Sequence, residues 1–286
     1  MIVDTHAHYL PQAMLDDLRN RSSDFPSIEC MQENDVWKLG FAGGPVSRPI
    51  HPNLRKGDTR LQWMDEQKVD VQVCGGWLDS FGYEIPDDEG MRWSQFLNEH
   101  LMKNCEASDR LAPLASVPLQ NGKMAAKVLE EALKAGFHGV MIGTQPKGGH
   151  GNLDDPDLDP FWEAASDLKA SVYLHPMFGC GDERMLDYQL LNIIGRGTDT
   201  ITAVARLIYS GHLLKYSGMN FVLSHGGGGL PFLMGRMRCG QEHNPEYGDP
   251  QASLEGCYYD TVVHDSNTLE FVCKQFGADR VMLGSD

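Results

Sequence analysis

The sequence lacks any pairing or regular spacing of cysteines. Its seven cysteines include no C-x-x-C pair and lie far apart along the chain. An odd number of scattered cysteines indicates free thiols rather than a disulfide framework. The first residues, from Met1 to His6, also lack the basic segment and apolar core of a secretory signal. These two absences predict a protein of the reducing cytoplasm.

Long apolar runs and an excess of basic residues are absent as well. No run approaches the roughly 18 to 20 apolar residues that are needed to cross a bilayer. The chain has 24 Lys and Arg against 40 Asp and Glu, a net charge of −16. Nucleic-acid-binding proteins need clustered basic side chains to replace the counterions of phosphates. We therefore expect neither a nucleic acid nor a membrane as a partner, and a small molecule as the ligand.

Short apolar runs that end in small or polar residues recur eight times along the chain. Several are rich in β-branched residues, as is typical of strands that are buried on both faces of a parallel sheet. Amphipathic stretches separate most of them, and alternation of strands with helices favours right-handed crossovers. The expected strands are Ile2–His6, Val69–Cys74, Leu114–Val117, Gly139–Ile142, Ser171–His175, Asn220–His225, Cys257–Thr261 and Arg280–Asp286. The expected helices are Gly90–Ala107, Gly122–Ala135, Asp159–Lys169, Asp199–Lys215, Leu230–Arg238 and Asn267–Phe276.

Eight such units predict an α/β fold of the (β/α)₈ TIM-barrel type, with residues 1–286 as a single domain. Residues 20–56 interrupt the first connection with several prolines and glycines, and a connection of that length is often a lid over the site. The sequence stops at the eighth expected strand without an eighth helix. We therefore expect a barrel that is truncated after this strand, in a protein that continues further.

Histidines and an aspartate follow several of the expected strands. His6 and His8 are two residues apart in a strand, so their side chains point the same way and could grip one ion. His175 and Asp286 lie at the ends of two other strands, and barrel enzymes react at that face. Imidazoles and a carboxylate suit one divalent metal, Zn²⁺ above all, with Mn²⁺, Co²⁺ and Fe²⁺ left open. The strand at 139–142 is followed by no lysine before Lys147, which favours one metal over a lysine-bridged pair.

A fourth histidine, His225, precedes four glycines. Glycines let the backbone approach a ligand closely, and an imidazole beside a metal site is a natural general acid or base. We therefore predict a catalytic role for His225, with the alternative that it is a further metal ligand. The glycines form neither a phosphate-binding loop nor an oxyanion motif, because no G-x-x-x-x-G-K-[ST], G-x-G-x-x-G or G-x-S-x-G pattern occurs.

Arginines offer a clamp for an acidic substrate, because the planar guanidinium matches two carboxylate oxygens. Arg48 lies in the expected lid, and Arg236 follows the glycine run by one helix. Trp77 could form a wall for a conjugated substrate or could pack within its own loop. Asp260 and His264, near the seventh strand, are both candidates to reach the pocket, and we prefer Asp260 because it lies within the strand.

The sequence resembles the metal-dependent decarboxylase branch of the amidohydrolase superfamily, and within it the 2-amino-3-carboxymuconate-6-semialdehyde decarboxylases. The resemblance spans nearly the whole chain and rests on Asp4–His8, Met64–Val73, Val117–Gln120, Leu174–Pro176, His225–Gly228, Gly235–Arg236 and Val281–Asp286. It implies that the zinc ligands are His6, His8, His175 and Asp286. It also implies that His225 is the acid–base residue, that Arg48 binds substrate, and that Arg236 reaches the neighbouring site of a homodimer.

The resulting expectation is a non-oxidative carboxy-lyase for a small unsaturated or aromatic carboxylate. An aminocarboxymuconate semialdehyde or an ortho-substituted benzoate would be such a substrate. The alternative is an amidohydrolase-type hydrolase or hydratase that uses a metal-bound hydroxide. A metal-storing or ligand-sensing barrel without turnover is the non-enzymatic alternative. The loops Gly75–Trp77 and Phe178–Gly181 depart from the family pattern, so the exact substrate stays open.

Overall fold

The computed structural model describes residues 1–177 and 179–286, and in that part of the chain two parallel sheets and one hairpin are found. The first sheet has the strand order β1-β4-β5, and the second has the order β10-β9-β8-β7-β6. The strands are β1 (Val3–His8), β4 (Val71–Gly75), β5 (Leu111–Pro113), β6 (Gly139–Gly143), β7 (Ser171–His175), β8 (Asn220–Leu223), β9 (Tyr258–Asp260) and β10 (Val281–Met282).

Backbone hydrogen bonds link the two sheets at both of their meeting edges. Ala115, just beyond β5, forms a parallel bridge with Val140 of β6. At the other edge, the amide of Thr5 in β1 donates to the carbonyl of Leu283 at 2.7 Å. The eight strands therefore follow the cyclic order of a (β/α)₈ barrel, with only a few bonds at each seam. The predicted α/β class with parallel strands is confirmed.

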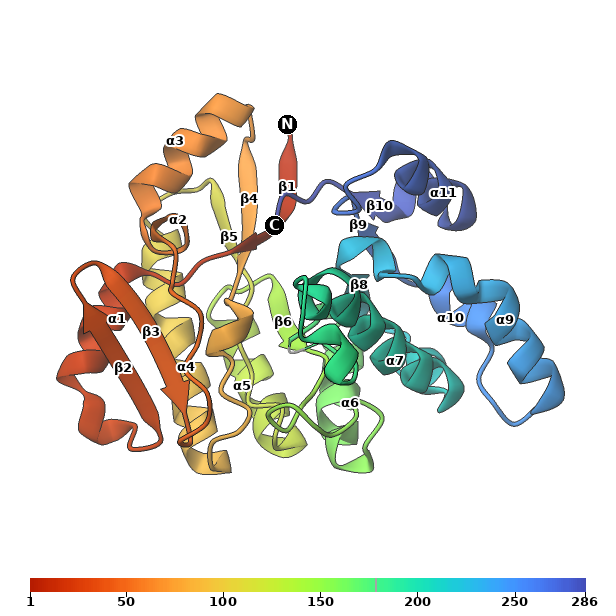
Figure 1. The fold of residues 1–286 in the computed structure, drawn as a ribbon, viewed down its shortest axis with the longest axis horizontal. Coiled ribbons are helices and arrows are strands. Elements are labelled where there is room, and N and C mark those ends of the chain that lie inside the picture. The colour runs from red at the N-terminus through yellow and green to blue at the C-terminus, as the bar shows by residue number, and fades with distance from the viewer. Residues whose placement is uncertain (178) are drawn as a thin grey trace.

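Helices follow the strands and surround them, as the colour sequence of Figure 1 shows. The longer ones are α1 (Gln12–Asn20), α3 (Gly57–Gln67), α4 (Asp87–Cys105), α5 (Gly122–Lys134), α6 (Asp159–Asp167), α7 (Arg196–Tyr209), α9 (Leu230–His243) and α11 (Ser266–Phe276). Three short ones are α2 (Pro52–Arg55), α8 (His212–Lys215) and α10 (Pro250–Glu255). In α5, Asn121 caps the N-terminus by accepting from the amide of Met124 at 3.1 Å, while Val128 and Leu129 are buried.

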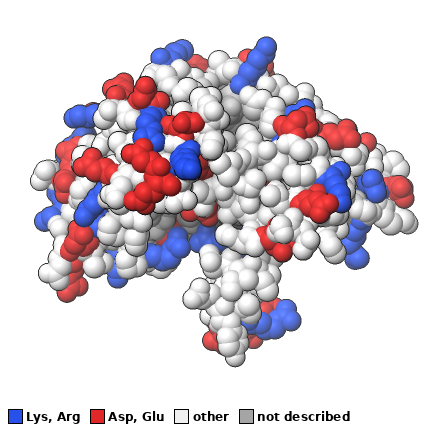
Figure 2. All heavy atoms as spheres, turned by 90° about the horizontal axis from the view of Figure 1, so that it is seen from above, with Lys and Arg blue, Asp and Glu red and all other residues white. Residues whose placement is uncertain are grey.

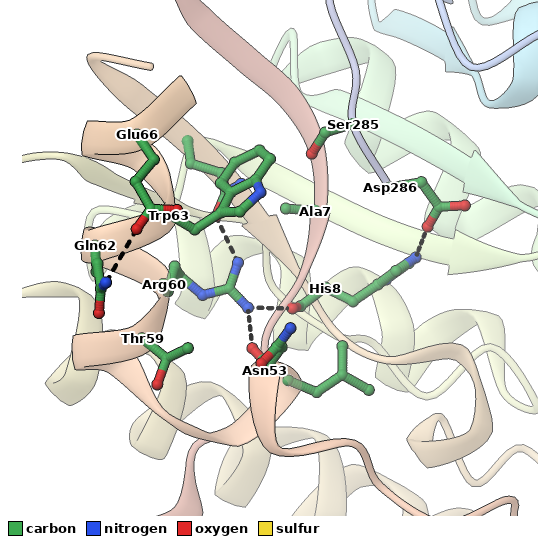
Figure 3. Close-up of a pocket in the computed structure, with 12 residues that line it drawn as sticks. Ala7, His8, Asn53, Thr59, Arg60, Gln62, Trp63, Glu66, Ser285 and Asp286 are labelled. Atoms are coloured by element: carbon green, nitrogen blue, oxygen red, sulfur yellow. Dashed lines mark hydrogen bonds and ion pairs between the residues drawn. The ribbon is translucent and has the colours of Figure 1, made fainter. Parts of the chain in front are cut away.

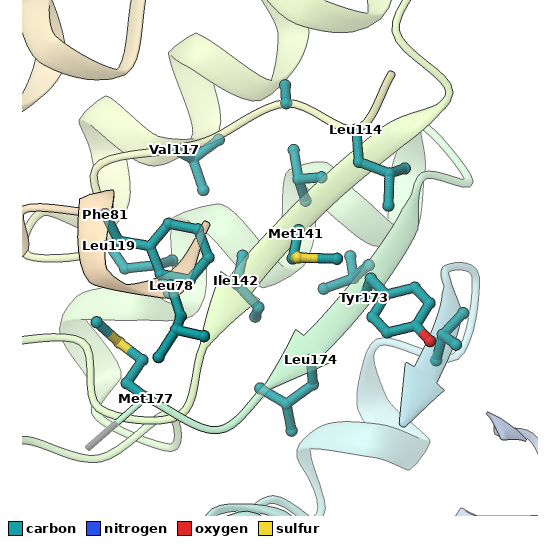
Figure 4. Packing of buried hydrophobic residues seen from close by; sticks show 14 of the residues in the cluster. Leu78, Phe81, Leu114, Val117, Leu119, Met141, Ile142, Tyr173, Leu174 and Met177 are labelled. Carbon is teal, nitrogen blue, oxygen red and sulfur yellow. The ribbon is translucent and has the colours of Figure 1, made fainter. Parts of the chain in front are cut away.

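The core is built from the apolar runs that the sequence shows. Met141 and Ile142 of β6 and Leu174 of β7 are completely buried, and Figure 4 shows them packed beside one another. Several large buried side chains pair their polar atoms within this packing. The indole of Trp93 donates to the carbonyl of Ser80 at 2.8 Å, for example. Such packing fixes the strand ends in place, and those ends carry the polar residues described below.

Three expected elements differ from the structure. The third barrel strand is β5, which begins three residues earlier than the expected strand at 114–117. Within the expected range, Ala115 forms an isolated bridge with Val140. The expected helix at 199–215 is two helices, because Gly211 between α7 and α8 has a φ of 79°. The last strand, β10, is limited to two residues, because the segment beyond it bonds to β1 through separate hydrogen bonds.

The insertion at residues 20–56 contains an antiparallel hairpin of β2 (Ile28–Glu33) and β3 (Val36–Phe41). Trp37 and Leu39 are buried, and Figure 1 places the hairpin beside α1 at the edge of the molecule. Beyond the hairpin, the same insertion brings Arg48 to the cavity described below. A lid function for this segment stays a prediction.

Candidate metal centre

Five polar residues converge at the carboxyl ends of the strands. His6 and His8 come from β1, His175 from β7, His225 follows β8, and Asp286 follows β10. One possible ligand atom from each of His6, His175, His225 and Asp286 lies within 4.8 Å of all the others. The Nε2 atom of His8 lies 3.1 Å from Oδ1 of Asp286. The structure thus brings together all five residues that the strand ends predicted.

The other ring nitrogen of three histidines is held by an acceptor. Nδ1 of His6 lies 2.7 Å from Oδ2 of Asp260, Nδ1 of His8 lies 2.9 Å from the carbonyl of Gly76, and Nδ1 of His175 lies 2.8 Å from the carbonyl of Pro176. Each Nδ1 therefore carries the proton, and each Nε2 lone pair points into the centre. This arrangement is typical of metal-ligating histidines.

The buried Nε2 atoms of His6, His8 and His175 make no hydrogen bond of acceptable geometry within the described part of the chain. Buried polar atoms without a partner are costly, so three of them facing one carboxylate indicate a site that is built to bind an electrophile. A divalent cation accepts exactly such lone pairs and would neutralise Asp286 at the same time. The donor set therefore fits a divalent metal ion.

Burial also keeps two of the imidazoles neutral. Burial lowers the pKa of His175 well below the usual range. Repulsion between protonated His175 and protonated His8 lowers it further. Burial lowers the pKa of His8 as well, although Asp286 opposes the shift. For His6, burial opposes protonation, but the hydrogen bond and charge of Asp260 prevail and raise its pKa. Neutral His8 and His175 are suited to bind a metal, and Asp260 makes His6 a stronger donor.

Asp260 lies behind the centre rather than in the pocket. Its side chain is completely buried and accepts from the hydroxyl of Tyr173 at 2.8 Å, in addition to His6. Its second oxygen accepts from the amides of Gly226 at 3.0 Å and Val262 at 3.1 Å. The expectation that Asp260 reaches the pocket is wrong, because all of its acceptor sites are used to hold other groups. His264 lines the cavity instead.

A hydrogen-bond network also fixes the segment that carries Asp286. The carboxylate of Asp4 accepts from the amide of Ser285 at 2.9 Å and from its hydroxyl at 2.6 Å. The amide of Asp286 donates to the carbonyl of His6 at 2.8 Å. Gln72 donates to the same Asp4 carboxylate at 2.7 Å. The position of Asp286 is therefore set by β1 and β4, far from it in sequence.

The backbone at His225 is strained. His225, Gly226, Gly227 and Gly228 all have positive φ angles, at 54°, 59°, 79° and 61°. A Cβ on Gly226 would lie 2.5 Å from Cγ1 of Val263, so this position requires glycine. A non-glycine residue at positive φ costs free energy and is often found at functional sites. The turn directs the ring of His225 to the centre, where its Nε2 lies 3.4 Å from Oδ2 of Asp286.

A cavity of about 840 Å³ opens beside the centre. His8, His175, His225 and Asp286 form part of its wall, together with Arg48 and Trp77. The guanidinium of Arg48 lies 5.6 Å from the ring centroid of Trp77 and pairs with Asp79 at 3.0 Å. Apolar residues complete the wall, among them Ile193, Ile194, Ile201, Val262 and Val263.

Arg236 does not reach this cavity. It lies exposed on α9, and the cavity of its own chain is lined by other residues. Its predicted place in a neighbouring site therefore stays a prediction. Phe178, in a loop that departs from the family pattern, lies outside the described residues.

Two arginines near the centre were not found by sequence reasoning. Arg196 lines the cavity, as discussed below. Arg60 of α3 is buried and donates to the carbonyl of His8 and to the side chain of Gln72, as Figure 3 shows for the contact with His8. Arg60 lines a second cavity, of about 470 Å³, whose wall also includes Asp286. The only signal in the sequence was a basic residue at a buried position of a helix, and that is not specific.

The acidic surplus is spread over the surface. On the face seen in Figure 2, acidic and basic side chains are interspersed, and a broad band without charges runs between them. No helix within residues 1–177 and 179–286 is both long and apolar enough to span a bilayer.

A family model described as amidohydrolase matches residues 3–286. The chain belongs to this family. The chain is 30% identical to a 2-amino-3-carboxymuconate-6-semialdehyde decarboxylase of Dictyostelium discoideum, over 99% of this chain and 80% of the relative. It is 26% identical to a gamma-resorcylate decarboxylase of Rhizobium sp., over 86% of this chain and 81% of the relative.

Solved structures share the fold of this chain. A 5-carboxyvanillate decarboxylase from Novosphingobium aromaticivorans, complexed with manganese and 4-hydroxy-3-methoxy-5-nitrobenzoic acid, superimposes with a TM-score of 0.80. The alignment covers 100% of this chain and 86% of the other at 20% identity. The likeness shows that the chain has the same fold as this solved structure.

Proposed function

We propose that this protein is a metal-dependent non-oxidative decarboxylase of a small unsaturated or aromatic carboxylate. The observation that carries the proposal is the set of Nε2 atoms of His6, His8 and His175 that face the carboxylate of Asp286. His8, His175 and Asp286 line a cavity that also holds His225 and Arg48. Decarboxylases among the relatives, with muconate and resorcylate substrates in their names, support the reaction class.

The proposed ligands are His6, His8, His175 and Asp286. His225 is assigned a different role because its Nδ1 lies 3.4 Å from the hydroxyl of Ser224. By contrast, the Nδ1 of each of the three proposed histidine ligands lies 2.9 Å or less from its acceptor oxygen. We propose zinc, since a set rich in imidazole suits this ion, while a related structure contains manganese. When bound, the ion acts as a Lewis acid that polarises a substrate oxygen.

The residues of the chain would then bind the substrate and supply a proton. Arg48 binds a carboxylate, and Trp77 lies against the conjugated part of the molecule. As the carbon–carboxylate bond breaks, its electron pair moves into the conjugated system and CO₂ leaves. His225 protonates the same carbon from Nε2 and later regains a proton from solvent. The apolar wall excludes water from the carbon before this transfer.

The test is CO₂ release by protein loaded with zinc or manganese, from ring-cleavage muconates and from ortho-hydroxy and ortho-amino benzoates. His225→Ala should retain its metal but lose activity by roughly 100-fold to 10,000-fold. His175→Ala is the control that should lose both metal and activity. Absence of CO₂ from the whole panel with metal bound would contradict the proposal. Incorporation of ¹⁸O from water without CO₂ would instead identify a hydrolase or hydratase.

We also propose a homodimer in which Arg236 serves the neighbouring site. In support, Arg236 is exposed on α9, and Phe232, one turn earlier, is 85% exposed. Exposed apolar residues of this size are typical of an interface. A mixture of His225→Ala and Arg236→Ala subunits should regain about a quarter of wild-type activity, because half of the sites in mixed dimers would be intact. If mixing restores nothing, Arg236 does not act across subunits.

A cytoplasmic location is proposed on the basis of the seven cysteines, all of which are free thiols.

We further propose that residues 1–286 act as one barrel domain with residues 20–56 as a lid-like insertion. The buried apolar residues support this, since they form one cluster from Tyr9 to Phe276. A single cooperative unfolding transition of the metal-free protein is the expected result.

A further inference from the structure

Arg196 is a cation of the cavity wall that the proposed function does not use. It is the first residue of α7 and is half-buried. Its NH1 donates to the carbonyl of Pro176 at 3.2 Å, and the same carbonyl holds Nδ1 of His175 at 2.8 Å. A single carbonyl group thus separates the guanidinium from a proposed metal ligand.

This guanidinium has no counter-ion among the described residues, since no carboxylate oxygen lies within 4.0 Å of it. The acids whose charges act on it are engaged elsewhere, and Asp286 faces the imidazoles of the proposed metal centre. Asp79 pairs with Arg48 at 3.0 Å, and Asp199 accepts from Gln145 at 3.0 Å and from Thr144. Burial lowers the pKa of Arg196, and the charge of Arg48 lowers it further. A half-buried charge without a partner is costly unless a ligand supplies the opposite charge.

The remaining donors of Arg196 are free for such a ligand. Nε and NH2 donate to no residue in the described part of the chain, whereas NH1 makes the bond to Pro176. Nε and one NH₂ group form the planar fork that binds a carboxylate through both oxygens. Arg196 and the metal centre share one cavity, whose wall includes the apolar residues Ile201, Val262 and Val263.

We propose that Arg196 binds a second carboxylate of the substrate, one that is retained in the reaction. The substrate class is then a dicarboxylate with an unsaturated or aromatic skeleton. This inference rests on the proposed function for the identity of the site, but the binding of the second carboxylate can be measured without turnover. Arg196 is a specificity-determining residue in this view, because it distinguishes dicarboxylates from monocarboxylates.

The experiment measures binding by calorimetry in a metal-loaded His225→Ala background, where ligands are not consumed. The probes are benzoate and the three benzenedicarboxylates, whose ortho, meta and para spacings report the distance between the two anchors. Arg196→Met should weaken binding of the best dicarboxylate by roughly 10-fold to 100-fold and that of benzoate by less than about threefold. Arg196→Lys should restore part of the difference, since it keeps the charge but not the fork.

Arg206→Met is the matched control, because Arg206 lies on the same helix but pairs with Asp154 at 2.7 Å outside the cavity. It should leave both affinities unchanged. Equal weakening of benzoate and dicarboxylates by Arg196→Met, or loss of metal, would show that Arg196 only supports His175 and would overturn the inference. If dicarboxylate binding depends on Arg196 but no CO₂ is released from any substrate, the proposed function fails and the assignment of Arg196 stands.

Discussion

Oδ2 of Asp260 accepts the Nδ1 proton of His6 at 2.7 Å, and neither side chain is exposed to solvent. The two residues are 254 positions apart in the chain. The same carboxylate holds the amide of Gly226 and thereby the turn that presents His225. One buried carboxylate therefore connects the first strand, the proposed metal ligands and the proposed proton donor.

The first prediction concerns this connection. Asp260→Asn should weaken zinc binding by roughly 10-fold to 100-fold, because an amide orients His6 poorly and does not increase its basicity. Competition with a chelator measures the zinc dissociation constant. Tyr173→Phe is the control, since it removes one hydrogen bond to Asp260 but leaves its contact with His6 intact. An Asp260→Asn protein with the wild-type zinc affinity would show that the contact is structural.

The second prediction concerns the pH dependence of the metal-free protein. His8 and His175 have pKa values below the ordinary 6.5 in the folded state. The unfolded chain therefore binds more protons as the pH falls below about 6.5, and these two residues make the fold less stable there. His6 opposes this effect because its folded pKa is raised.

The His175 contribution can be isolated by substitution. Between pH 7.5 and 5.5, His175→Gln should lose less stability than the wild type, with a difference of up to about 1.4 kcal/mol per pH unit. Urea unfolding at several pH values, with chelator present, measures it. Parallel pH profiles for the two proteins would mean that His175 does not titrate differently on folding.

The third prediction uses a pair of glycines. Gly226→Ala should destabilise the protein by about 1–3 kcal/mol and reduce activity, because the new Cβ would meet Val263 and the backbone has a positive φ. Gly235→Ala, in the middle of α9 with nothing within 4 Å of its Cβ position, should instead stabilise the protein by about 0.5–1 kcal/mol. Thermal unfolding of both variants compares the two effects. The strain argument fails if Gly226→Ala is as stable as the wild type.

The fourth prediction tests the anchor of Asp286. Ser285→Ala removes the hydroxyl bond to Asp4 but leaves the backbone bond from the amide of residue 285. We expect a loss of about 1 kcal/mol in stability and a several-fold weaker zinc affinity, because Asp286 becomes less well positioned. Ser210→Ala, whose hydroxyl contacts His212 away from the centre, is the control. An unchanged zinc affinity in Ser285→Ala would show that the backbone bonds alone suffice.

Much of the architecture could be predicted from local patterns. The run at 171–175 forms β7 as expected, and the amphipathic stretch from Gly122 forms α5, because burial and side-chain periodicity act over a few residues. The hairpin of β2 and β3 was missed. Its prolines and glycines lie mostly beyond the strands, so composition indicated a loop where Trp37 and Leu39 provide enough burial for pairing.

The sequence by itself determined which side chains stand at the strand ends, because strand alternation places His6 and His8 on one side and a parallel sheet collects its carboxyl ends at one face. Only the tertiary structure decided what each of them contacts. Asp260 is a support rather than a pocket residue because its hydrogen-bond partners come from distant segments. Arg196 lines the cavity and has no counter-ion within residues 1–177 and 179–286 for the same reason, since neither burial nor the absence of a partner can be read from its neighbours in the chain.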